Sequence, residues 1–136
     1  MIGIILMSHG KMAEGMLESS KLFFDEPVKI KALCIEEGDN PEDFDQRILD
    51  AAKELDDGSG VIALCDLLGG TPSNRSMRVL NDRLQVITGM NLTMFLELLG
   101  LRMSSETIDD IDIDSLIETG KNGIVSLNNV VNRVCR

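Results

Sequence analysis

Tryptophan and tyrosine are absent from this sequence, and four phenylalanines are its only aromatic residues. Flavins and single-stranded nucleic acids commonly stack on aromatic side chains, so their usual binding platforms are missing. Basic residues are also scarce, because 13 lysines and arginines face 23 aspartates and glutamates, for a formal net charge of −10. This balance argues against a surface for nucleic acid or anionic lipid, since both need clustered positive charge.

Residues that bind metals are few. The sequence contains one histidine and three widely separated cysteines, Cys34, Cys65 and Cys135. A zinc site needs three or four ligands, so this set argues against a metal centre. Cys34 and Cys65 end strand-like runs, where a thiol usually packs as a small hydrophobic group. We therefore expect no disulfide, a reducing compartment and a cytoplasmic location.

Long hydrophobic runs are also missing, since none approaches the roughly 20 residues of a membrane-spanning helix. The apolar start, residues 1–7, lacks the basic residues and cleavage site of a signal peptide. We interpret it as a buried strand. With 136 residues and no repeat, low-complexity tract or linker, the chain is expected to fold as one domain, 1–136.

Short apolar runs alternate with segments of helical periodicity. The runs predict strands over residues 2–7, 28–35, 61–65 and 84–88. The first helix is expected to carry Met12, Met16 and Phe23 on its inward face. Later helices are expected to begin at the N-cap residues Asn40, Thr71 and Asn91, and a last one to stop at Gly120.

This alternation predicts an α/β fold, a doubly wound, open and mainly parallel sheet with helices on both faces. The common strand order 2-1-3-4 makes the first and third strands neighbours. Residues 124–127 fit either an extra C-terminal strand or a turn of helix. Sites in such sheets form at the carboxyl ends of strands where the order reverses, so residues 8–10 and 66–71 are expected to face each other.

His9 and Asp66 follow these two strands and are the candidate reactive pair. A lone histidine is most often structural or solvated, and an acid often simply ends a strand. At the expected mouth of the sheet, however, a carboxylate accepting from the imidazole Nδ1 fixes the tautomer and leaves Nε2 free as a nucleophile.

Gly69, Gly70 and Thr71 form the candidate phosphate-binding loop. Taken alone they fit an ordinary turn and helix start. Two glycines, however, let the backbone approach a ligand closely, and the Thr71 hydroxyl adds a donor. A nucleophilic histidine, an orienting aspartate and an anion-binding loop together describe a phosphoryl acceptor, whose chemistry requires no cofactor.

Three separated stretches carry a family resemblance. They are Met7-Ser8-His9-Gly10 followed by Ala13-Glu14-Gly15, then Asp66 through Asn74, then Thr88-Gly89-Met90-Asn91-Leu92. In this order and spacing they resemble the mannose-family IIA component of the bacterial sugar phosphotransferase system.

The resemblance implies an open α/β sheet, a homodimer and a cytoplasmic phosphotransferase. In that family a histidine takes a phosphoryl group from the phosphocarrier protein HPr and passes it to a IIB component, which phosphorylates sugar with the membrane components IIC and IID. His9 matches the acceptor, on Nε2, and Asp66 its orienting carboxylate. Thr71 falls where members place a hydroxyl near the phosphate.

Leu68 departs from some relatives, which carry tryptophan on this rim that meets partner proteins. Leucine keeps an apolar contact with less area. The sequence has no IIB domain after residue 136, so IIB is expected as a separate chain. Some relatives exchange a C-terminal strand between subunits, which bears on residues 124–127.

Other classes fit less well. A receiver domain needs an acidic pair after its first strand, where this chain has Ser8 and His9. The glycine-rich nucleotide motifs and the serine-hydrolase elbow are absent. Two alternatives of the same fold stay open: a phosphorylation-sensing regulatory domain, and a carrier serving dihydroxyacetone kinase, which generally lacks a loop like residues 66–72.

Overall fold

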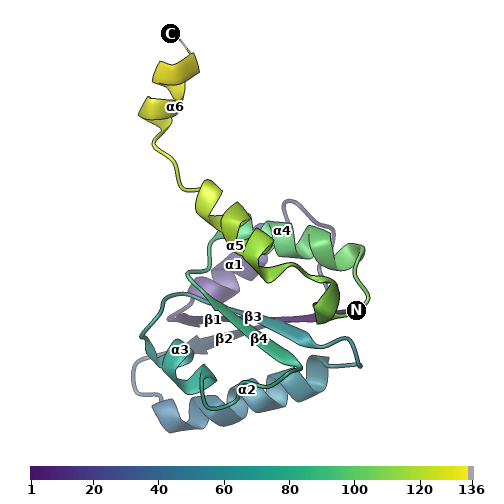
Figure 1. The fold of residues 1–136 in the computed structure, drawn as a ribbon. Helices are drawn as coiled ribbons and strands as arrows, with labels where there is room; N and C mark the ends of the chain where they lie inside the picture. Colours follow the sequence, from purple (N-terminus) through teal and green to yellow (C-terminus); the bar gives the residue numbers. More distant parts are fainter. Residues whose placement is uncertain (135–136) are drawn as a thin grey trace.

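The computed structural model describes residues 1–134 and shows a sheet enclosed by helices (Figure 1). The strands are β1 (Gly3–His9), β2 (Ile30–Ile35), β3 (Val61–Cys65) and β4 (Leu84–Thr88). The helices are α1 (Met12–Ser20), α2 (Pro41–Leu55), α3 (Thr71–Ser76), α4 (Leu92–Met103), α5 (Ile113–Asn122) and α6 (Leu127–Val134), with a 3-10 turn η1 (Ile108–Asp110).

The strand order is β2-β1-β3-β4 and every pairing of these strands is parallel, which confirms the predicted fold class and order. The central strands β1 and β3 are buried almost throughout, as strands covered on both faces must be. Their register pairs Met7 with Cys65, so both strands end at the same edge of the sheet.

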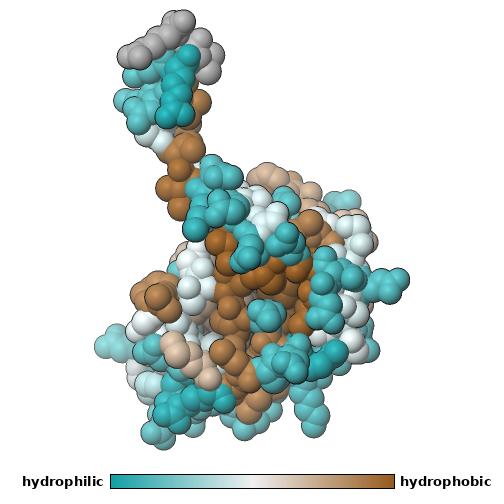
Figure 2. Space-filling model, viewed as in Figure 1, coloured by the Kyte–Doolittle hydropathy of each residue, from teal (hydrophilic) through white to brown (hydrophobic). Residues whose placement is uncertain are grey.

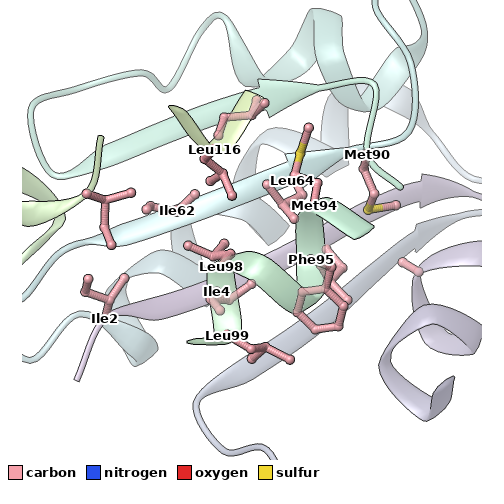
Figure 3. Packing of buried hydrophobic residues seen from close by; sticks show 14 of the residues in the cluster. Ile2, Ile4, Ile62, Leu64, Met90, Met94, Phe95, Leu98, Leu99 and Leu116 are labelled. Atoms are coloured by element: carbon pink, nitrogen blue, oxygen red, sulfur yellow. The ribbon is translucent and has the colours of Figure 1, made fainter. Parts of the chain in front are cut away.

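Successive side chains of each strand enter two separate hydrophobic cores, because the side chains of a strand alternate between the faces of the sheet. Ile4 and Leu6 of β1 belong to the core with α4 and α5, part of which Figure 3 shows around Phe95. Ile5 and Met7 belong to the core on the other face, with Phe44 of α2. Both faces are therefore covered by helices.

Two predicted N-caps are confirmed. Asn40 Oδ1 accepts from the Glu42 N–H at 3.0 Å, and Asn91 Oδ1 accepts from the Met94 N–H at 2.8 Å. The third was wrong by one residue: Gly70 is the N-cap of α3 and Thr71 is its first residue. Thr71 lies at the N-terminus of α3 whether it is the N-cap, as predicted, or the first helical residue, as observed.

Three expectations about element ends were also wrong. Phe23 lies outside α1 and is 61% exposed, because the helix ends at Ser20, whose hydroxyl donates to the Leu17 carbonyl at 2.6 Å. The second strand begins at Ile30, two residues later than expected. The helix expected to stop at Gly120 continues to Asn122.

The C-terminal segment 124–127 forms neither alternative as a whole. Residues 124–126 form no strand, and α6 begins at Leu127. The Ser126 hydroxyl accepts from the Asn129 N–H at 3.3 Å, a local bond that favours a helix start over an extended segment. Figure 1 shows α6 projecting away from the sheet and its covering helices.

Cys34 and Cys65 are buried free thiols, as expected, whereas Cys135 lies outside the described residues. Within residues 1–134, no helix combines the length and apolar character needed to cross a membrane.

Candidate functional site

His9 and Asp66 meet at the carboxyl edge of the sheet. His9 is the last residue of β1, and Asp66 directly follows the neighbouring strand β3. The Asp66 N–H donates to the Met7 carbonyl at 3.0 Å, which continues the pairing of the two strands into the site. The structure thus brings together two residues that stand 57 positions apart, as the strand order predicted.

The Asp66 carboxylate holds His9 by two hydrogen bonds to a single oxygen. Oδ2 accepts from the His9 backbone N–H at 2.8 Å and lies 2.7 Å from the ring Nδ1. The other oxygen, Oδ1, accepts from the Leu67 N–H at 2.9 Å. Because an ionised carboxylate can only accept, Nδ1 carries the proton and Nε2 keeps its lone pair in the neutral imidazole.

Exposure differs sharply across this pair. The Asp66 side chain is 6% exposed and that of His9 is 46% exposed. Burial opposes ionisation of Asp66, but the hydrogen bonds from the backbone and ring of His9 and from Leu67 outweigh it and lower the pKa of the carboxyl. The carboxylate is therefore a charged, fixed acceptor beneath an accessible ring.

Cys65 supports the same carboxylate from inside the sheet. Its Sγ lies 3.7 Å from Asp66 Oδ1, and burial together with the Asp66 charge raises the pKa of the thiol to about 12. Cys65 is therefore a protonated thiol at neutral pH and not a competing nucleophile.

Gly70 covers the His9 ring. A Cβ on Gly70 would overlap the ring at Cε1 and would lie 3.0 Å from Nε2. A side chain at position 70 would therefore displace the imidazole or shield its free nitrogen. Gly69 has a φ of +89°, the left-handed region that glycine tolerates, and its carbonyl accepts from Asn74 Nδ2 at 3.1 Å.

Thr71 and His9 lie on the wall of the same hollow, which has a volume of about 560 Å³. The chain after β2 completes this wall with the carboxylates Glu36, Glu37 and Asp39. The predicted residues His9, Asp66, Gly70 and Thr71 thus gather in one place. The hollow is bordered by carboxylates, two of which are ion-paired, and no sequence pattern indicated this.

Leu68 is 72% exposed on the loop between β3 and α3, next to the half-exposed Leu67. Both leucines lie on the same loop as Gly70. The structure therefore exposes two apolar side chains on this loop, and the role of Leu68 in partner contact stays a prediction.

Ser8 is a residue of the site for which no role was predicted from the sequence. Its buried hydroxyl accepts from the Ala13 N–H at 2.8 Å and lies 3.1 Å from the Gly10 carbonyl. These bonds fix the turn from β1 into α1, and with it the backbone of His9. The signal was a small hydroxyl residue just before a glycine at a strand end.

In the described part of the chain, no three histidine, cysteine, aspartate or glutamate side chains gather in a way that would hold a metal ion. The site is thus built from a histidine, a carboxylate and a glycine-rich loop.

The sequence model of the EIIA-man family, described as the PTS system fructose IIA component, matches residues 3–113. The match includes both strands of the site and the loop between β3 and α3. This chain belongs to the EIIA-man family. It is a IIA component of the sugar phosphotransferase system, involved in phosphoryl transfer.

Solved structures agree with the family. The chain is similar to a phosphotransferase system component EIIA from Streptococcus agalactiae, with 28% identity, a TM-score of 0.83, and coverage of 95% of this chain and 99% of that one. It is similar to a PTS IIA protein associated with the fucose utilization operon of Streptococcus pneumoniae, with 27% identity, a TM-score of 0.82 and 95% coverage of both chains.

A mannose/sorbose-specific IIA subunit from Enterococcus faecalis is similar at 27% identity and a TM-score of 0.80, over 93% of this chain and 94% of that one. A sigma-54 interaction domain protein from the same organism shares the fold alone, at 16% identity and a TM-score of 0.62. No curated protein sequence matches the chain.

Proposed function

We propose that this EIIA-man protein carries a phosphoryl group on His9, which it accepts from phospho-HPr and donates to a IIB component. The observation that carries the proposal is the bond from His9 Nδ1 to Asp66, at 2.7 Å. It leaves Nε2 as the unprotonated nitrogen of a half-exposed ring, which is the state that a phosphoryl acceptor needs.

The proposed step exchanges one nitrogen–phosphorus bond for another. The His9 Nε2 lone pair attacks the phosphorus of phospho-HPr, the bond from phosphorus to the donor histidine breaks, and that histidine leaves with the bonding pair. His9 keeps its Nδ1 proton, and Asp66 stabilises the positive ring that results. Attack by a nitrogen of IIB on the same phosphorus reverses these changes and restores neutral His9.

Gly70 and Thr71 would serve the phosphoryl group itself. The missing side chain of Gly70 leaves room at Nε2, and the Thr71 hydroxyl lies on the wall of the same hollow. With Gly69, which allows the turn before them, they form the proposed phosphate-binding loop. A hydroxyl donor aimed at the transferring oxygens stabilises charge that develops during transfer.

The carboxylates of the hollow oppose a dissolved anion only in part. Glu36, Glu37 and Asp39 line the hollow beside His9. Two of them are ion-paired, Glu36 with Lys11 at 3.3 Å and Asp39 with Arg47 at 4.0 Å, which reduces their repulsion of free phosphate. When a docked protein delivers the phosphoryl group, the other contacts of the protein–protein interface offset this repulsion. In the proposal, the exposed Leu68 provides an apolar contact for HPr and IIB. The membrane components IIC and IID act after IIB, and all steps on the IIA protein take place in the cytoplasm.

A homodimer is part of the proposal, and apolar surface supports it. β4 is one of the two edge strands of the sheet, and Met77 and Leu80 just before it are exposed. Exposed apolar side chains also follow α5, at Ile124, Val125 and Leu127. Figure 2 shows apolar surface on the segment before α6 and on the front of the domain. A second copy would cover this surface, and sedimentation at several concentrations tests it.

The deciding experiment is phosphorylation by phosphoenolpyruvate, enzyme I and HPr, read by intact mass. His9 is the only histidine, so tag-free protein offers one site for an acid-labile phosphoryl group. We expect one added phosphoryl group, lost in acid and absent in His9→Gln, and its chase onto added IIB. A label that is stable in acid or that persists in His9→Gln would refute the assignment.

Transfer of the label to added IIB distinguishes the proposed carrier from the two alternatives that have the same fold. A regulatory domain would accept the phosphoryl group and retain it when IIB is added. A carrier for dihydroxyacetone kinase would pass it to the kinase components instead. Transfer to IIB is therefore required for the function proposed here.

A further inference from the structure

An ion pair between Asp45 of α2 and Arg75 of α3 lies beside the candidate site. Arg75 Nε donates to Asp45 Oδ1 at 2.7 Å and Nη2 donates to Oδ2 at 2.9 Å, the two-pronged geometry that binds a guanidinium most specifically. The side chains are only 18% and 23% exposed, so solvent screens them less than a surface pair. The pair joins two elements from residues 30 positions apart.

The helix that this pair holds depends on its neighbours for its position. α3 has six residues, begins at Thr71 and has Gly70 as its N-cap. A helix of this length is marginal alone, so contacts with other elements determine where it lies. Within residues 1–134, its side chains make hydrogen bonds to other elements only through Arg75 and through a long contact from Ser76 Oγ to Met7 Sδ, at 3.8 Å.

We infer that the Asp45–Arg75 pair is a positioning device for phosphoryl transfer, which holds Gly70 over the His9 ring and Thr71 on the wall of the hollow. This inference rests on the proposed function of His9. The bonds that orient His9 itself run to Asp66, between β1 and β3, and do not pass through α3. The pair therefore acts on the covering loop and not on the nucleophile.

Loss of the pair should release the loop while leaving the nucleophile in place. In Arg75→Gln we expect the rate of His9 phosphorylation by phospho-HPr to fall about tenfold, because positioned reactions lose rate steeply when groups move by less than 1 Å. The Nδ1 proton of His9 should stay bonded to Asp66 in NMR spectra. Hydrogen exchange of the amides of residues 67–71 should accelerate.

The chain offers a matched control pair. Arg83 Nε and Nη2 donate to the two oxygens of Asp56 at 3.0 and 2.7 Å, in the same two-pronged geometry. This pair joins the end of α2 to the start of β4, at the amino edge of the sheet and thus opposite His9. Arg83→Gln removes one such ion pair and should leave the phosphorylation rate within about twofold of the parent.

The comparison of Arg75→Gln with Arg83→Gln decides the inference. A slower transfer and a local rise in exchange only in Arg75→Gln support it. Equal rates in the two variants, or exchange that rises evenly across the chain in Arg75→Gln, overturn it. If Arg75→Gln fails to fold, Asp45→Asn removes the same charge pair with nearly unchanged side-chain size.

Failure of the proposed function gives a different result. A folded parent protein that phospho-HPr does not label refutes the role of His9. In that case the exchange of residues 67–71 still shows whether the pair holds the loop, but the inference of a role in transfer falls with the function.

Discussion

Gly70 lies directly against the imidazole of His9, so close that a single methyl group on its Cα would overlap the ring. The contact joins the loop after β3 to the last residue of β1. The size of the side chain at position 70 therefore determines how accessible the free nitrogen Nε2 of His9 is.

Gly70→Ala should therefore slow phosphorylation of His9 by at least about tenfold, because the ring must move or Nε2 becomes shielded. Gly100→Ala in α4 is the control, since a Cβ there meets nothing within 4 Å and alanine favours a helix. Single-turnover labelling with excess phospho-HPr measures both. A Gly70→Ala protein as fast as Gly100→Ala would show that this contact does not limit access.

Asp66→Asn should reduce the transfer rate by about 10- to 100-fold, the range expected for a hydrogen bond to a charged group. The carboxamide keeps its size but no longer stabilises the positive ring. Nitrogen NMR of the imidazole should show Nδ1–H losing its dominance over Nε2–H. Unchanged tautomers with an unchanged rate would remove Asp66 from the mechanism.

Thr71→Val should slow transfer about five- to tenfold, since it removes one hydroxyl donor worth about 1 kcal/mol at nearly constant size. Thr71→Ser keeps the hydroxyl and should stay within about twofold of the parent. The decisive result is a faster transfer rate in Thr71→Ser than in Thr71→Val. If both variants lose rate equally, the Thr71 methyl and not its hydroxyl matters.

Stability should fall in acid, partly through Asp56. Hydrogen bonds from the Arg83 side chain and from the Gly58 and Gly60 N–H groups lower the pKa of this carboxyl in the folded chain. The unfolded value is about 3.9, so the stabilisation is complete above about pH 5 and is lost as pH falls from about 4 toward the lower folded pKa. Urea midpoints should therefore drop between pH 5 and 2.5.

Asp56→Asn supplies the check on that assignment. The variant should be less stable than the parent at pH 6, and the difference should shrink toward pH 2.5. A difference that is constant with pH would mean that the charge of Asp56 contributes nothing to folding.

The sheet and the candidate pair of His9 and Asp66 could be predicted from the sequence because both follow from local patterns. Four apolar runs separated by helical segments admit few parallel topologies, and the order 2-1-3-4 brings the ends of the first and third strands together. His9 and Asp66 occupy those ends, so their meeting required no knowledge of side-chain packing. The caps at Asn40 and Asn91 are also local, since each bonds an N–H two or three residues later.

Features that depend on side-chain packing could not be predicted from the sequence. The expected strand order brings residues 66–71 opposite His9, but no pattern indicates that Gly70 touches the ring of His9. No pattern links Arg75 to Asp45. The helical periodicity that included Phe23 carried no information on where α1 ends. A short apolar run such as residues 124–127 fits a strand or a helix equally well, and in the structure residues 124–126 are neither, with α6 beginning at Leu127.

The site joins residues 57 positions apart through a parallel strand pairing, and this has a consequence for synthesis. A ribosome releases His9 early, long before the residues of β3 exist. Until β3 pairs with β1, no carboxylate fixes the tautomer of the imidazole and no loop covers it. Long-range parallel pairings also form slowly. Under the proposed function, competence to accept a phosphoryl group is therefore acquired late in folding, and a nascent or misfolded chain would take phosphoryl groups from the donor more slowly than the folded protein.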